Sequence, residues 1–113
     1  MFLAMVKISP SRGKQQEVLD ILLSVKGPML AASGSIECSI YEERDEEYAI
    51  IFMEKWHMRS EMIDHIGSAL YARVLKALEL SDRPPEICFY EIAGTQGIEL
   101  IENVRTSTAG IRR

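Results

Sequence analysis

The sequence lacks several features that would indicate particular kinds of function. Its 113 residues carry 13 Lys and Arg against 17 Asp and Glu, a net charge of −4, with no basic stripe. That balance disfavours nucleic acid as a partner. No apolar run approaches the ~18 residues of a membrane helix, and no basic flank with a long apolar stretch marks a signal peptide. We therefore expect one soluble, cytoplasmic domain without a membrane partner.

Potential metal ligands are also scarce. The two cysteines, Cys38 and Cys88, lie far apart in strand-like segments. They have neither the density of a disulfide framework nor the short spacing of metal ligands, so buried reduced thiols are the simplest interpretation. The two histidines, His57 and His65, have no obvious third ligand beside them. We expect no metal site.

Polar alternation is missing from three strand-like segments, residues 2–8, 48–56 and 87–93. A sheet with one face in water normally alternates apolar and polar side chains. Segments that are apolar on both faces need cover on both sides, and the chain has only enough helix for one face. Because a second copy of the sheet would cover the other face, the sequence predicts a homodimer that buries roughly 800 Å² per partner.

Helical periodicity and turn residues place the other elements. We expect one helix over about residues 12–25, ended or interrupted by Gly27-Pro28, and a second helical stretch over 59–80 with a bend at Gly67-Ser68. The expected strands are 2–8, 35–42, 48–56 and 86–96. This order is the ferredoxin-like βαββαβ arrangement, an α+β fold with an antiparallel sheet. Right-handed crossovers place both helices on one face of the sheet.

Two further segments are polar or weakly patterned. Residues 42–47 carry six adjacent charges and are expected to form a solvated hairpin loop, not a metal site. One domain is expected over residues 1–96, followed by a C-terminal extension over 97–113 that ends in a frayed polar segment from 105 onward. The extension has two open alternatives: its apolar residues pack on the partner subunit or close a pocket, or it is disordered after Asn103.

The candidate chemistry lies at the end of the third predicted strand. Phe52, Glu54 and Trp56 have the period of two that places side chains on one face. His65 follows nine residues after Trp56, in the next predicted helix. Because the chain folds back there, we expect Trp56 and His65 to meet at the mouth of a cavity between helices and sheet. Trp offers stacking area and an N–H donor, and neutral His takes a proton from a hydroxyl near pH 7, which suits a flat phenolic or quinol-like ligand.

Each of these residues also has a structural interpretation. Trp56 is equally consistent with packing at the sheet edge or an interface. His65 fits a role in capping a helical segment or binding a backbone carbonyl, and Glu54 a role in binding the backbone, Lys55 or Arg59. Three amphipathic tyrosines are further candidates for a pocket wall or its rim: Tyr41, Tyr71 and Tyr90.

These motifs carry a resemblance to a known family. Glu54-Lys-Trp56, then His65 with Ser68 to Tyr71 after it, resembles the antibiotic biosynthesis monooxygenase (ABM) superfamily, over roughly residues 1–95. The segment Gly34 to Tyr41 is similar to that family's second strand. The resemblance implies a dimeric α+β barrel built from two ferredoxin-like sheets.

The resemblance also implies a function. Some members of the family oxygenate aromatic polyketides or quinols without metal or flavin, others degrade heme, and others isomerise a small sugar derivative. Heme degradation needs an Asn on the first strand, and Phe2 to Ile8 contains none. We therefore expect a cofactor-independent monooxygenase of the ABM type that acts on a small aromatic or quinol-like substrate, with no cofactor. The alternative is a non-catalytic dimeric protein of the same fold that binds a small molecule.

The resemblance and the spacing together give the predicted site. His65 and Trp56 are the expected catalytic residues. The expected substrate-binding residues are Phe52, Glu54, Tyr71 and Tyr41.

Overall fold

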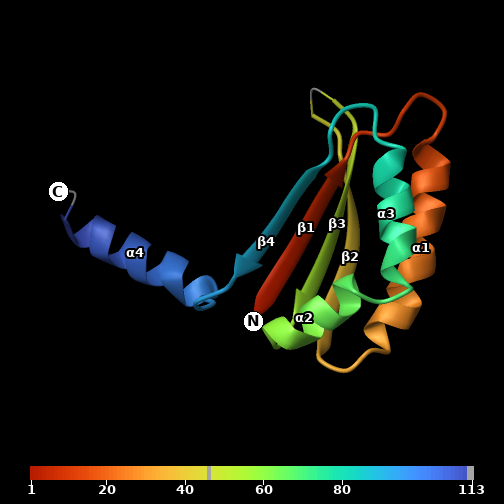
Figure 1. The fold of residues 1–113 in the computed structure, drawn as a ribbon. Helices are drawn as coiled ribbons and strands as arrows, with labels where there is room; N and C mark the ends of the chain where they lie inside the picture. The colour runs from red at the N-terminus through yellow and green to blue at the C-terminus, as the bar shows by residue number, and fades with distance from the viewer. Residues whose placement is uncertain (46, 112–113) are drawn as a thin grey trace.

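Four strands form one antiparallel sheet with the spatial order β2-β3-β1-β4 (Figure 1). The computed structural model describes residues 1–45 and 47–111. The strands are β1 (Phe2–Ile8), β2 (Ser35–Glu43), β3 (Ala49–Trp56) and β4 (Glu86–Glu91). The helices are α1 (Gln15–Leu30), α2 (Arg59–Ile66), α3 (Tyr71–Glu79) and α4 (Ile98–Ile111). This order confirms the predicted ferredoxin-like α+β fold.

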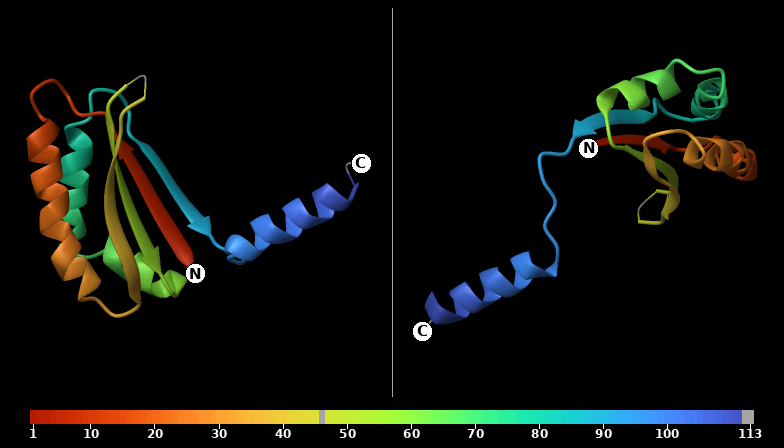
Figure 2. Two further views of the ribbon diagram at one scale, coloured as in Figure 1. Left: turned by 180° about the vertical axis from the view of Figure 1, so that it is seen from behind. Right: turned by 90° about the horizontal axis from the view of Figure 1, so that it is seen from below.

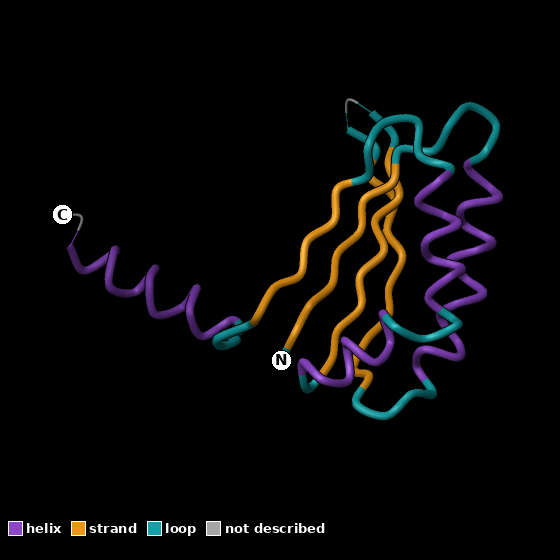
Figure 3. Tube along the Cα trace, in the orientation of Figure 1, coloured by secondary structure: helices purple, strands orange, loops and turns teal. Residues whose placement is uncertain are grey.

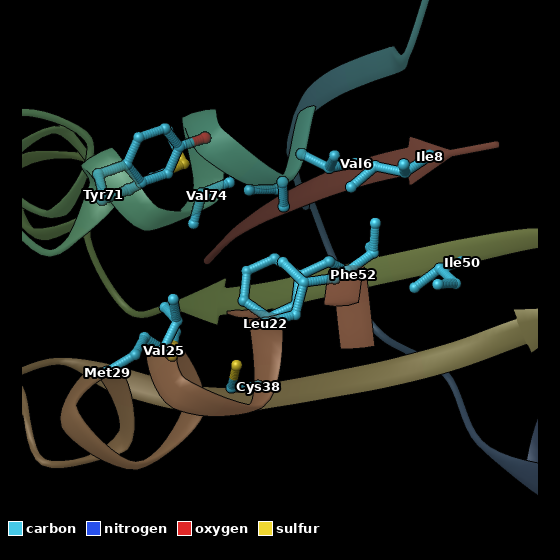
Figure 4. Close-up of a cluster of buried hydrophobic side chains, with 14 of the residues drawn as sticks. Val6, Ile8, Leu22, Val25, Met29, Cys38, Ile50, Phe52, Tyr71 and Val74 are labelled. Atoms are coloured by element: carbon cyan, nitrogen blue, oxygen red, sulfur yellow. The ribbon is translucent and has the colours of Figure 1, made fainter. Parts of the chain in front are cut away.

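The core lies between the sheet and helices α1 and α3, which run side by side on one face (Figures 1 and 2). Alternate residues of β1 and β3 point into it, as a period of two requires. Figure 4 shows Leu22, Val25 and Met29 of α1 facing the sheet near Phe52. All four side chains have no exposed surface, so this layer anchors the end of β3 where the candidate site begins.

The opposite face of the sheet has no helix against it among the described residues (Figure 2). We call this surface the open face. Its apolar centre is made of half-buried side chains of β1 and β3: Leu3, Met5, Ile51 and Met53. Lys7 on the same face is paired with Glu43, at 2.9 Å between Nζ and Oε2. The strands are thus apolar on both faces, as the sequence predicted.

Helix α1 continues through Gly27-Pro28, where the sequence predicted an end or interruption. Pro28 has no N–H to donate to the Ser24 carbonyl four residues earlier. That carbonyl instead accepts a hydrogen bond from Arg73 Nη1 of α3, at 3.1 Å. A tertiary contact therefore supplies the donor that the proline lacks.

The second helical stretch is divided into α2 and α3, which confirms the predicted bend at Gly67-Ser68 (Figure 3). Strand β4 ends at Glu91, five residues earlier than predicted. Residues 98–111 form α4, although the sequence predicted a frayed polar segment from 105 onward. Residues 112–113, and residue 46 of the hairpin, lie outside the described residues. No helix in the described ranges is both long and apolar enough to cross a membrane.

Candidate functional site

A cavity of about 480 Å³ opens between the end of α1 and helix α2. Trp56, the last residue of β3, forms part of its wall, and His65 of α2 forms another part. The remaining lining residues come from α1, from the loop after it, and from α2 and the connection to α3: Met29, Ala32, Ser33, Glu61, Asp64, Ser68 and Leu70. A volume of this order is within the range of small-molecule sites, ~300–1,000 Å³.

Gly34 allows the chain to bring these two parts of the wall together. Its φ of +82° is a conformation that side chains rarely adopt, and a Cβ there would overlap the Glu61 carboxyl group. The Gly34 carbonyl accepts a hydrogen bond from the His57 N–H at 2.9 Å. Glu61 in turn accepts one from the Met58 N–H at 3.1 Å, at the start of α2. The start of β2 is thereby joined directly to the first turn of α2.

Two aromatic rings pack against His65. The Trp56 and His65 ring centroids are 5.0 Å apart, with 38° between the planes. Tyr71 meets His65 edge-on, at 5.3 Å and 89°. The structure thus brings Trp56 and His65 together beside a cavity, as predicted, and the Tyr71 ring restricts how the imidazole can turn.

A buried carboxylate contacts the same imidazole. Glu54 Oε2 lies 2.5 Å from His65 Nε2, and the two side chains are only 1% and 5% exposed. The approach is off the favoured direction, so neither atom has a well-directed hydrogen bond among the described residues. A buried carboxylate without a partner is costly, and the only group this contact offers Glu54 is the imidazole N–H. The two residues therefore form one acid–base unit.

The negative charge of Glu54 acts on its other neighbours too. Burial, and then the charge of Glu54, raise the pKa of Tyr71 to about 12. The same two causes, in the same order, raise the pKa of Cys38, which is paired with Glu54 across the β2–β3 ladder, to about 12. Tyr71 and Cys38 therefore stay protonated at neutral pH, and Cys38 is not a thiolate nucleophile.

Tyr71 predicts a loss of stability in alkaline solution. An unfolded tyrosine has a pKa near 10, and the folded value is about 12. The folded state holds the proton more tightly, so this stabilisation is complete below pH ~10 and is lost as pH rises through ~12, about 3 kcal/mol in all. We expect Tyr71→Phe to flatten this part of the curve of unfolding free energy against pH, measured with urea.

The comparison is best made in a Cys38→Ala background, because the Cys38 thiol titrates in an overlapping range. An equally steep curve with Phe at position 71 would show that Tyr71 does not titrate as described.

Only two of the four predicted substrate-binding residues lie beside His65. Tyr71 and Glu54 contact or adjoin His65. Phe52 is fully buried in the core and does not line the cavity. Tyr41 is paired with Ile51 on the open face and is 48% exposed. The structure does not bring Tyr41 to this site, because it lies on the face of β2 that points away from the helices.

Sequence reasoning missed the partner of Glu54 and much of the cavity wall. Glu54 was assigned to the backbone or to nearby basic residues, but it contacts His65. A usable signal was present: a Glu between Phe52 and Trp56 on a buried strand face needs an internal partner. The part of the wall from α1 and its loop, including Met29 and Ser33, gave no signal.

A larger hollow, about 850 Å³, lies at the hairpin end of the sheet. Most of its charged lining residues are paired with one another: Lys7 with Glu43 and Glu86, and Arg83 with Glu47. Nothing there resembles the aromatic and imidazole pair, so the smaller cavity is the candidate site. Within residues 1–45 and 47–111, no three His, Cys, Asp or Glu side chains are grouped to hold a metal ion.

Comparisons with known proteins agree with this architecture. Rv0793 from Mycobacterium tuberculosis has a TM-score of 0.76 at 18% identity, over 85% of this chain and 98% of its own. A Deinococcus radiodurans protein has a TM-score of 0.76 at 16% identity, over 87% and 98%. A Methanosarcina mazei protein gives 0.72 at 23%, over 80% and 90%. At these identities the likeness shows the fold alone.

The family itself is shown by sequence. No curated protein gives a significant match. A family model described as antibiotic biosynthesis monooxygenase, however, matches residues 1–77, which is more than half of the chain and includes the cavity residues on β3 and α2. The chain therefore belongs to the antibiotic biosynthesis monooxygenase family.

Proposed function

We propose that this protein is a cofactor-independent monooxygenase for a small phenolic or quinol-like substrate held in the cavity beside Trp56 and His65. The observation that carries the proposal is the buried contact of Glu54 Oε2 with His65 Nε2, at 2.5 Å, at the wall of that cavity. Membership of a monooxygenase-type family supports the reaction class.

The Glu54–His65 pair fits the first step, which is removal of the substrate's hydroxyl proton. With the Nε2 proton directed at Glu54, the other ring nitrogen, Nδ1, is unprotonated and accepts a proton from the ligand. The imidazolium that forms is then stabilised by the carboxylate 2.5 Å away. This is the role that a buried acid plays behind a catalytic histidine in hydrolases.

The position of Trp56 suits it to bind the aromatic ring of the substrate. Its indole is at the cavity wall and 1% exposed, and Nε1 has no hydrogen-bond partner in the described part of the chain. The indole face offers stacking area and Nε1–H a donor for the ligand's oxygen. The bound anion passes one electron to O₂, and the radical and superoxide recombine. Overall, the substrate loses two hydrogen atoms, one from a ring carbon and one from its hydroxyl group, and gains one oxygen atom at that carbon, while the second oxygen atom of O₂ leaves as water.

Oxygen uptake tests this proposal. Purified protein is incubated with a panel of quinols and anthrones while dissolved oxygen is followed. We expect at least one of them to be consumed, and His65→Ala to lower the rate on the order of 10²–10⁴-fold, the usual contribution of a general base. A rate that His65→Ala leaves unchanged would remove His65 from the mechanism.

The alternative function is non-catalytic binding of a small molecule. The near-complete burial of Glu54 and His65 favours it, since a purely structural pair has no need of solvent. The chain has one tryptophan, so fluorescence reports on the cavity directly. Ligands that change Trp56 emission without any oxygen uptake favour this alternative.

We also propose that the protein is a homodimer paired through the open face. Leu3, Met5, Ile51 and Met53 form a half-buried apolar patch there. A contiguous apolar patch of this kind on a small domain is typical of a protein interface.

A further inference from the structure

Helix α4 carries an apolar stripe that nothing else in the described chain covers. Ile98, Ile101 and Val104 recur at intervals of three residues and are 62%, 55% and 53% exposed. Leu100, which adjoins the same stripe, is 49% exposed. The other side of the helix is polar, with Glu99, Glu102, Asn103 and Thr106, and Arg105, seven residues after Ile98, ends the apolar stripe.

A helix of this kind needs a surface to pack on. Isolated helices shorter than ~12–15 residues are marginal in water, and most helices in proteins are stabilised by packing an amphipathic face. Helix α4 has 14 residues, and its second half contains Thr106, Thr108 and Gly110, which have low helix propensity. Its stability in solution therefore depends on covering the stripe.

The position of α4 indicates where that surface lies. Residues 92–97 lead the chain away from the end of β4, and α4 stands clear of the domain on the opposite side of the sheet from α1 and α3 (Figures 1 and 2). The open face is the face of the sheet that those two helices leave bare. The stripe of α4 and the open face thus lie on the same side of the sheet.

We propose that α4 is a dimerisation arm, whose stripe packs on a second copy of this chain and extends the interface formed by the open faces. Two-fold symmetry makes such an exchange reciprocal, because each copy gives one arm and receives one. The inference concerns assembly and is independent of the oxygenase chemistry.

The size of the surfaces supports this occupant. Strands of six to nine residues at ~3.3 Å per residue, four of them ~4.8 Å apart, give the open face a projected area of about 500 Å². A 14-residue helix is ~21 Å long and ~10 Å wide, so one arm given and one received add about 400 Å² to each copy. The arm thus nearly doubles the projected area that each copy offers its partner, toward the roughly 800 Å² per partner that a stable interface buries.

The polar side of α4 argues against a membrane as the occupant. Helices that lie in the membrane interface carry Lys and Arg on their polar face. Glu99 and Glu102 occupy that side of α4 instead. A protein surface is the better match for the stripe.

The test changes the stripe in the full-length chain. The variant Ile101→Glu/Val104→Glu places two carboxylates on the stripe, and the matched control Asn103→Glu/Thr106→Glu places two on the polar side of the same helix. Dimer dissociation constants are measured by sedimentation over a dilution series. We expect the stripe variant to raise the dissociation constant at least tenfold and the control to change it less than threefold. Amide hydrogen exchange in α4 should also slow as wild-type concentration passes the dissociation constant.

Three results would overturn the proposal. Equal dissociation constants for the stripe variant and wild type would show that α4 lies outside the interface, even if the open faces still pair. A lower unfolding midpoint for the stripe variant within a monomeric Met53→Lys background would show that α4 packs on its own subunit. Binding of wild type, but not of the stripe variant, to vesicles containing phosphatidylserine would assign the stripe to a membrane.

Discussion

Glu54→Gln should remove most of the oxygen uptake while leaving the protein about as stable as wild type. Gln has the size of Glu and keeps a side-chain oxygen beside the His65 ring, but it carries no charge to stabilise an imidazolium 2.5 Å away. In the hydrolase triads the corresponding loss of charge is severe. We expect the rate of oxygen uptake to fall on the order of 10²–10⁴-fold. The substitution removes a buried carboxylate and conserves its volume, so the unfolding free energy should change by less than about 1 kcal/mol.

Asp64→Asn is the matched control for Glu54→Gln. Asp64 is a second carboxylate at the cavity wall, but it is exposed and has no contact with His65 among the described ion pairs. Its replacement should change the rate less than threefold. If Glu54→Gln behaves like Asp64→Asn, Glu54 has a packing role only, and the acid–base unit is not part of the chemistry.

Met53→Lys should convert the protein to a monomer at micromolar concentration. Met53 lies at the centre of the open face, directly opposite Met5 on β1 and next to Ser39 on β2. In a lone subunit the new lysine keeps its ammonium group in water, whereas in the paired dimer it would be buried without a partner. A buried unpaired charge costs several kcal/mol, so the dimer dissociation constant should rise at least ~100-fold.

Light scattering coupled to size exclusion gives the mass directly. Met53→Leu, which conserves volume and polarity, should remain dimeric. Apart from the contribution of α4, the monomeric variant should keep the helical far-ultraviolet signal of wild type, because the core lies on the other face of β3. A wild type that elutes as a monomer would contradict the interface, and a Met53→Lys protein that stays dimeric would place the interface elsewhere.

Patterns of a few residues were enough to predict most of the fold. The apolar runs on β1 and β3 indicated strands that are apolar on both faces, and the Gly67-Ser68 break separated α2 from α3 correctly. The continuation of α1 past Pro28 was not predictable, because the donor that replaces the missing N–H comes from Arg73, 45 residues later in the chain. Local rules have no access to a contact of that kind.

The candidate site was only partly predictable, because some of its contacts also depend on tertiary packing. Side chains alternate along β3 and the chain turns back after it, so the sequence predicted that Trp56 lies beside His65. Their ring centroids are 5.0 Å apart. The period also put Glu54 on that face, but only the packing of α2 shows that its carboxylate reaches the imidazole. Tyr41 was chosen by residue type, and its strand position places it on the wrong face.

The most direct test is the ionisation state of a phenol bound without oxygen. The probe is 4-nitrophenol, whose phenolate form absorbs visible light and whose neutral form does not, titrated anaerobically at a pH below its own pKa. Binding is followed independently by the fluorescence of Trp56, the one tryptophan of the chain. We expect wild type to bind the phenol as its phenolate, and His65→Ala to bind it in the neutral form. If wild type binds the neutral form, the Glu54–His65 pair does not accept the proton and the proposed chemistry is wrong.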